Sequence, residues 1–101
     1  MYDMANIKKL AKFDKLTGET WKAFVAFDQA ALADGAIPKK YKELMAVAVA
    51  LTTQCPYCVE IHKEAAIKAG ATEQELAEAV FVAAALRAGG SITHGTHVIG
   101  G

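Results

Sequence analysis

Apolar residues recur along this chain at intervals of three and four, which is the spacing of one helical face. Residues that commonly begin helices precede these segments, as Asp3, Pro38 and Thr72 do. Segment 45–51 alternates β-branched residues with alanine, but its alanine content and the lysines before it favour helix over strand. The pattern predicts an all-α fold. The first helix runs from Asp3 to about Gly18, the second opens at Thr17 or Thr20 and stops near Gly35, and the third begins at Ile37-Pro38. The fourth runs from Pro56 to Ala69 with Gly70 as its left-handed cap, and the fifth opens with a capping box at Thr72 to Glu75.

Two of these helices have apolar surfaces of different breadth. In the second, Trp21 and Phe24 belong to one apolar stripe, which could line a substrate pocket or fill the core. Aromatic stripes of this kind usually fill a core, so we expect that role for them. In the fifth, nearly every face from Leu76 to Leu86 is apolar. A helix of this kind is expected to be covered on more than one side, by its own domain and by a second subunit. The pair Gly89-Gly90 either breaks this helix or lets another backbone approach closely.

Length and charge exclude several classes of protein. The 101 residues suit one domain, spanning 1–101, with a single modest core. Eleven basic and 11 acidic residues give a net charge of +0, so nucleic acid and anionic membrane surfaces are not expected partners. Hydrophobic residues make up 53% of the chain, which is above the usual share. We therefore expect a homo-oligomer that buries part of this surface.

The sequence also indicates a cellular compartment. The first residues carry scattered charges and no apolar central stretch, so no signal peptide is expected and the predicted location is the cytoplasm. The longest uncharged run before the tail, 44–59, is too short to span a membrane. In a reducing cytosol, a Cys-x-x-Cys pair is more often catalytic or metal-binding than a permanent structural link. The sequence has no Gly-x-Gly-x-x-Gly or phosphate-loop motif, so no nucleotide cofactor is expected.

The candidate chemistry lies in Glu43-x11-Cys55-Pro56-Tyr57-Cys58-x3-His62. Proline suits the first position of a helix, so Cys55 should cap the helix and Cys58 should lie one turn inside it. Residues three and four apart share a helical face, which brings the two sulfurs within reach of a disulfide and places His62 on the same side. The positive end of the helix dipole favours thiolate, the reactive form of cysteine. This spacing predicts a redox site.

Glu43 is the fourth candidate residue. It falls at or near the apolar side of the third helix, which Val47 and Leu51 mark. A buried carboxylate needs a hydrogen-bonding partner, and an imidazole from the next helix would serve. The alternative is an exposed Glu43 at the edge of its helix beside lysines.

The motif from Glu43 to His62, with the apolar fifth helix and its Gly-Gly pair, resembles the AhpD-like alkylhydroperoxidases of the carboxymuconolactone decarboxylase superfamily. The resemblance implies a small all-helical protein that forms trimers or hexamers. It implies that Cys58 reacts with a peroxide, that Cys55 is the resolving partner, and that Glu43 and His62 form a proton relay. Electrons would come from a dithiol or lipoyl-bearing protein, because the chain has no flavin or nicotinamide motif. The best-studied members have a second histidine between the cysteines, whereas this chain has Tyr57, a poor base near neutral pH.

Three other interpretations compete with a peroxidase. Cys55 and Cys58 could join His94 and His97 in a tetrahedral zinc site, although Pro56 favours a helix where such ligands usually occupy a tight turn. A non-catalytic assembly protein could use the same dithiol to report oxidation to a partner. Decarboxylation, suggested by the superfamily name, would not need the dithiol. A thioredoxin-like fold is excluded because the βαβ pattern is missing.

Overall fold

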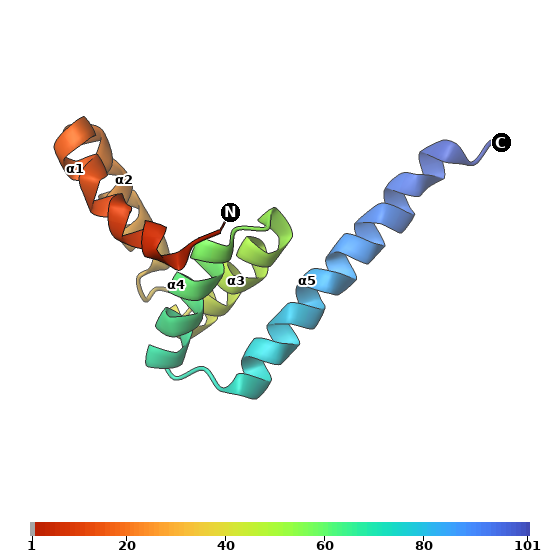
Figure 1. Ribbon diagram of the computed structural model, residues 1–101. Helices are drawn as coiled ribbons and strands as arrows, with labels where there is room; N and C mark the ends of the chain where they lie inside the picture. Colours follow the sequence, from red (N-terminus) through yellow and green to blue (C-terminus); the bar gives the residue numbers. More distant parts are fainter. Residues whose placement is uncertain (1) are drawn as a thin grey trace.

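The computed structural model describes residues 2–101, and no strand occurs among them. This confirms the predicted all-α class. The elements in chain order are the 3-10 helix η1 (Met4–Ala11), α1 (Lys12–Thr17), α2 (Glu19–Leu32), α3 (Lys39–Thr53), α4 (Pro56–Lys68), α5 (Glu73–His94) and the 3-10 helix η2 (Gly95–Val98). Figure 1 shows α3 and α4 as a central hairpin, with η1, α1 and α2 on one side of it and the long α5 on the other.

The first two predicted helices are displaced slightly from their expected limits. Asp3 caps η1 as predicted, because its Oδ1 accepts a hydrogen bond from the Ala5 N–H at 2.9 Å. Gly18 has φ +52°, a left-handed value that glycine tolerates, and it both ends α1 and precedes α2. The prediction that Thr17 or Thr20 opens α2 is therefore wrong. The Thr17 hydroxyl instead donates to the carbonyl of Phe13 at 2.6 Å. The helix α2 also ends at Leu32, before the expected Gly35.

The α3–α4 hairpin holds the small core. Helix α3 begins after Pro38, and its first N–H, from Lys39, donates to Asp34 Oδ1 at 2.7 Å. The hairpin turn passes through Gln54, which has φ 56°. The buried apolar residues are mostly small, which allows the helices to approach closely: Val47, Ala50, Ala66, Ala71 and Ala83.

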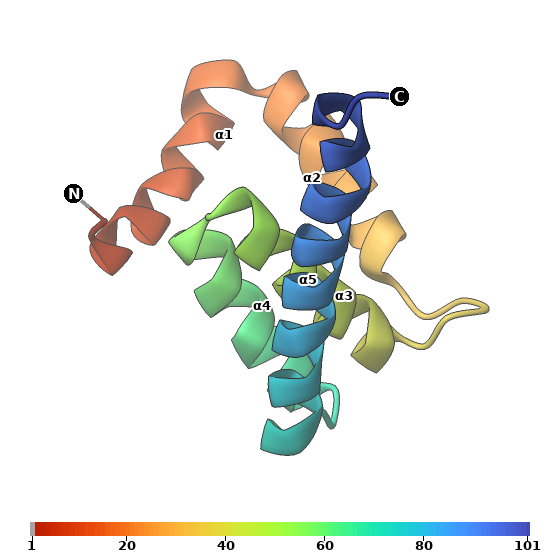
Figure 2. The same ribbon diagram turned by 90° about the vertical axis from the view of Figure 1, so that its right-hand side faces the viewer.

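Helix α5 is held to α3 at two places. The predicted capping box at Thr72 and Glu75 is present. Glu75 also forms an ion pair with Lys40 of α3, whose Nζ lies 2.9 Å from Glu75 Oε2. One turn before the Gly-Gly pair, Arg87 Nη1 donates to the carbonyl of Thr52 at 2.6 Å, near the end of α3. Beyond Arg87 the helix continues away from the hairpin, as Figures 1 and 2 both show. The first half of α5 therefore belongs to the core region, and the second half is an extension of it.

Neither expectation for Gly89-Gly90 describes this structure. The helix runs through both glycines without a break, and no atom lies within 4 Å of a Cβ built on either one. The apolar side chains of α5 are largely uncovered, with Phe81 74% exposed and Leu86 69% exposed. This chain alone thus covers only one side of the helix.

The molecule is open for its size. Its radius of gyration is 16.8 Å, whereas a compact domain of this length has about 13 Å. Its accessible surface is 7631 Å², whereas a folded monomer of this mass exposes about 5500 Å². In Figure 2, α5 crosses in front of the α3–α4 hairpin and its C-terminal end extends past it.

Among the described residues, one helical stretch, Glu73–Val98, is long and apolar enough to cross a membrane. Its most apolar window has a mean hydropathy of 1.3 and is 6% buried. The expectation of no membrane helix rested on segment 44–59 and did not consider this stretch. Length and composition alone do not distinguish a membrane-spanning helix from an apolar helix that is covered by protein neighbours.

Candidate active site

The two cysteines form a disulfide at the N-terminus of α4. Cys55 is the N-cap in an extended conformation, and its Sγ accepts a hydrogen bond from the Cys58 N–H at 3.3 Å. Pro56 occupies the first turn, where its missing N–H leaves no bond unmade. The predicted geometry of the pair is thus confirmed. Both residues are partly exposed, so the sulfur pair lies at the surface end of the helix.

Glu43 and His62 join the two helices of the hairpin. The Glu43 side chain is 3% exposed, and its Oε1 lies 2.7 Å from His62 Nδ1. The prediction of a buried carboxylate facing an imidazole is confirmed, and the exposed alternative is wrong. His62 thus contacts Glu43 of α3 and also lines the same pocket as the two cysteines, so it links the buried carboxylate to the dithiol.

Lys39 is a further member of this group that the sequence interpretation missed. Its Nζ donates to Glu43 Oε2 at 2.9 Å and to the carbonyl of Leu32, the last residue of α2, at 3.4 Å. The available signal was the spacing, because a lysine four residues before a glutamate on one helix can form an ion pair. Each carboxylate oxygen of Glu43 therefore has its own partner.

The charges at the site have a definite arrangement. Burial opposes ionisation of Glu43, but the hydrogen bonds from His62 and Lys39 outweigh it and hold the pKa of this carboxyl below its ordinary value. An ionised Glu43 only accepts hydrogen bonds, so the Nδ1 of His62 must carry the proton between them. The Nε2 of His62 is then free to act as a base.

The dithiol opens into an apolar pocket of about 530 Å³. Trp21 and Phe24 of α2 line it together with both cysteines, so the expectation that these aromatic residues only fill a core is wrong. Phe24 is 54% exposed, which also excludes a core position. The full lining comes from η1, α2, and α4 with its N-cap: Asn6, Ile7, Leu10, Trp21, Phe24, Val25, Asp28, Cys55, Tyr57, Cys58, Ile61 and His62.

The hydroxyl of Tyr57 contacts the N-terminal segment. Asn6 Nδ2 donates to this oxygen at 3.1 Å, and the backbone N–H of Asp3 donates to it at 3.4 Å. Neither Glu43 nor His62 has a hydrogen bond with Tyr57 within the described chain. Tyr57 thus occupies the position between the cysteines without joining the Glu43–His62 pair.

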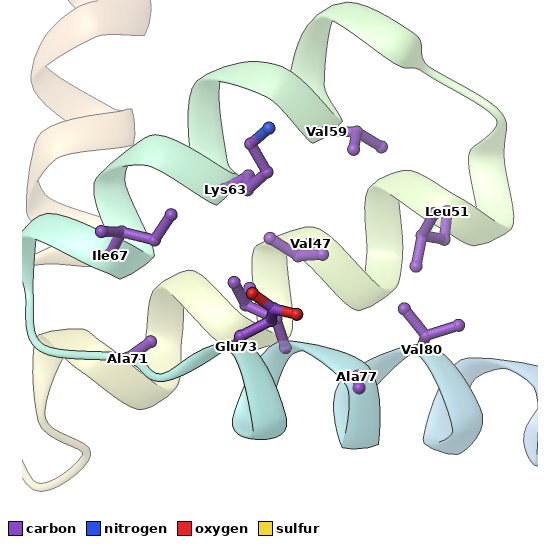
Figure 3. A pocket seen from close by; sticks show the side chains of 10 residues that line it. Val47, Leu51, Val59, Lys63, Ile67, Ala71, Glu73, Ala77 and Val80 are labelled. Atoms are coloured by element: carbon purple, nitrogen blue, oxygen red, sulfur yellow. The ribbon is translucent and has the colours of Figure 1, made fainter.

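A second cavity of about 640 Å³ lies between α3, α4 and α5 (Figure 3). Its walls are apolar apart from Lys63 and Glu73, and Figure 3 shows Val47, Leu51 and Val80 around it. It contains neither cysteine nor His62. The larger cavity is therefore separate from the candidate chemistry.

The proposed zinc ligands do not form a site within one chain. Cys55 and Cys58 are bonded to each other, and the rings of His94 and His97 meet edge-on with centroids 4.9 Å apart and planes at 69°. Across residues 2–101 there is no group of three or more His, Cys, Asp or Glu side chains that could hold a metal ion. Within residues 2–101, the two cysteines and the two histidines therefore form separate pairs rather than one group of four.

The fold and the site together define a class: a small all-helical protein with a Cys-x-x-Cys pair at a helix N-terminus and, on the same pocket, a histidine that is bonded to a buried glutamate. Residues 18–99 match the Carboxymuconolactone decarboxylase family. This chain belongs to that family, as its resemblance to the AhpD-like proteins indicated.

Relatives and solved structures agree with this assignment. The chain is 43% identical over 98 residues to "Uncharacterized protein 4 in cox locus" of Paracoccus denitrificans, covering 90% of this chain and 87% of that protein. It is similar to the crystal structure of an apo carboxymuconolactone decarboxylase family protein from Legionella pneumophila, with a TM-score of 0.77, 39% identity, and coverage of 89% and 80%. It is also similar to a crystal structure from Methanobacterium thermoautotrophicum, with a TM-score of 0.80, 34% identity, and coverage of 87% and 99%.

Proposed function

We propose that this protein is a thiol-dependent peroxidase that reduces hydroperoxides with Cys58 and Cys55, assisted by His62 and Glu43. One observation carries the proposal: a Cys-x-x-Cys disulfide opens into an apolar pocket that His62 also lines, and His62 is oriented by a buried carboxylate. Membership of a family whose AhpD-like members carry this dithiol supports it.

In the first step, the Nε2 of His62 takes the proton of the Cys58 thiol. The Cys58 thiolate then attacks the outer oxygen of the hydroperoxide, forming an S–O bond and breaking the O–O bond. The leaving alkoxide takes the proton back from His62 and departs as an alcohol, or as water when the substrate is hydrogen peroxide. Cys58 becomes a sulfenic acid, oxidised by two electrons while the peroxide is reduced by two.

In the second step, the Cys55 thiol attacks the sulfur of the Cys58 sulfenic acid. The S–S bond forms, the S–O bond breaks, and water leaves. The resulting disulfide corresponds to the bond between Cys55 and Cys58 in this structure. A dithiol reductant, such as a lipoyl-type group on a partner protein, restores both thiols by exchange and becomes a disulfide itself.

We further propose that the protein acts as a cytoplasmic homo-oligomer, a trimer or a hexamer. The exposed apolar side chains of α5 and the apolar cavity in Figure 3 support this assembly, since a large apolar surface usually marks an interface. A surface excess of roughly 2000 Å² over a compact monomer is of the size that a stable interface buries.

The test is rapid mixing of the fully reduced protein with hydrogen peroxide and with cumene hydroperoxide. Loss of both thiols and formation of the Cys55–Cys58 disulfide are followed by mass spectrometry. The expected result is stoichiometric oxidation much faster than that of a free thiol. Cys58→Ser should abolish peroxide consumption, whereas Cys55→Ser should stop after one oxidation with a sulfenic acid on Cys58. Oxidation at the rate of a free thiol would contradict the peroxidase and favour a role in sensing or disulfide exchange.

A further inference from the structure

The N-terminal segment is attached to Tyr57, one of the two residues between the cysteines. Asn6 Nδ2 and the Asp3 N–H both donate to the Tyr57 hydroxyl, at 3.1 and 3.4 Å. The ring of Tyr2 meets the ring of Tyr57 edge-on, with centroids 5.8 Å apart and planes at 68°. Three contacts from the start of the chain therefore converge on one side chain at the N-terminus of α4. We call these contacts the Tyr57 anchor.

The anchored segment is also a wall of the dithiol pocket. Asn6, Ile7 and Leu10 of η1 line the same pocket as Cys55 and Cys58. Asp3 fixes where the turn begins, because its side chain caps the Ala5 N–H. No residue of η1 is buried, so this wall has little packing of its own to hold it in place. Its position over the sulfurs thus depends strongly on the Tyr57 anchor.

We infer that residues 2–11 form a specificity-determining wall of the dithiol pocket and that Tyr57 is the positioning residue that holds this wall in place. With the wall in place, the cysteines face a pocket of about 530 Å³ with mostly apolar sides, which admits a compact apolar molecule or a thin apolar arm. The wall narrows the approach of a bulky reagent or a folded protein surface to the partly exposed cysteines, and movement of the wall widens this approach. As far as it concerns peroxide substrates, this inference rests on the proposed function.

This assignment also gives Tyr57 a physical role. Its hydroxyl oxygen accepts two hydrogen bonds from the N-terminal segment, and it is a poor base near neutral pH. Its contribution is to restrict access to the dithiol, whereas His62 handles the proton. Replacing Tyr57 should therefore change which molecules react more than it changes the chemistry of the thiols.

The test compares Tyr57→Phe and Asn6→Ala with the parent, and uses Lys9→Ala as the matched control on the exposed side of the same turn. Tyr57→Phe removes one oxygen and keeps the ring contact with Tyr2. The reduced proteins are alkylated with iodoacetamide and, separately, with a maleimide joined to a long polyethylene glycol. The rate with the bulky reagent should rise by about tenfold in Asn6→Ala, which removes one hydrogen bond, and by more in Tyr57→Phe, which removes the acceptor of two. The iodoacetamide rate should stay within about twofold in both variants. Lys9→Ala should match the parent with both reagents.

A second readout is the ratio of kcat/KM for cumene hydroperoxide to kcat/KM for hydrogen peroxide. This ratio should fall by roughly tenfold in Tyr57→Phe, because an apolar substrate loses contact with one wall. An unchanged ratio of the two alkylation rates in both Tyr57→Phe and Asn6→Ala overturns the inference. If the parent consumes neither peroxide, the proposed function fails, while the alkylation rates still decide whether the wall exists.

Discussion

The Oε1 of Glu43 lies 2.7 Å from the Nδ1 of His62, across the hairpin of α3 and α4. This contact joins a buried residue of one helix to a partly exposed residue of the next, beside the Cys55–Cys58 pair. It orients the imidazole and sets which of its nitrogens is free. The chemical consequences of this single contact can be measured separately from those of the dithiol.

Replacing His62 with alanine should slow the reaction of reduced Cys58 with peroxide by roughly 100-fold or more at neutral pH, because the variant lacks the proposed general base. The difference should shrink above about pH 8.5, where a free thiol ionises without help. Stopped-flow rates measured from neutral to alkaline pH check this. A constant ratio between parent and variant across that range would remove His62 from thiol activation.

Replacing Glu43 with glutamine should make the free energy of unfolding depend less on pH in the acid range. The pKa of Glu43 is lowered in the folded state, so its stabilising effect is complete above the ordinary value of 4.5 and is lost as the pH falls through the folded-state pKa. In that acid range, the free energy of unfolding should change less steeply with pH in the variant than in the parent, by at most about 1.4 kcal/mol per pH unit. Urea unfolding at a series of acid pH values measures it, with the exposed Glu64→Gln as the matched control. Equal slopes in parent and Glu43→Gln would contradict the cause assigned to the shift.

Replacing Lys39 with methionine should raise the pKa of Glu43, because one of the two hydrogen bonds that lower it is removed. The acid loss of stability should then begin at a higher pH than in the parent, with a cost of about 1 kcal/mol at neutral pH, since Lys39 is partly exposed. Lys39→Arg keeps the charge and should behave nearly as the parent. The same unfolding series tests both variants, and identical curves for Lys39→Met and Lys39→Arg would show that the charge has no such effect.

Placing charge on the uncovered side of α5 should break the assembly. Phe81→Glu and Leu86→Glu put carboxylates on side chains that are 74% and 69% exposed in the single chain, so one chain alone tolerates them. Sedimentation velocity should show a smaller species for each variant than for the parent. Gln29→Glu, on an exposed position of α2, adds the same charge and should leave the size unchanged. A monomeric parent, or variants of parental size, would contradict the homo-oligomer.

The parts of the structure that the sequence predicted are those set by neighbouring residues. Pro56 and the spacing of Cys55, Cys58 and His62 determine the first turn of α4 locally, and the capping box at Thr72 does the same for α5. The pairing of Glu43 with His62 was also accessible, because a buried carboxylate needs a partner and the next helix offered one.

The parts that were missed depend on how distant segments pack. The stripe of Trp21 and Phe24 shows that one face of α2 is apolar, but not whether that face covers a core or a pocket. The contact of Asn6 with Tyr57 joins residues far apart in the chain, and no sequence pattern around either residue predicts this contact. Lys39 was visible as a neighbour of Glu43, yet its second contact, with the carbonyl of Leu32, requires knowing where α2 ends.

The parts of α5 before and after Arg87 differ in what their side chains contact. Residues before Arg87 include Ala83, which is buried within the chain, so substitutions there change the stability of each chain's own fold. Residues after it, such as Ile92 at 76% exposed, have little cover within their own chain. In an assembly, a substitution at Ile92 would leave the individual fold intact and alter only which other chains it can join. In the proposed homo-oligomer, this extension would therefore set which chains associate independently of the dithiol site.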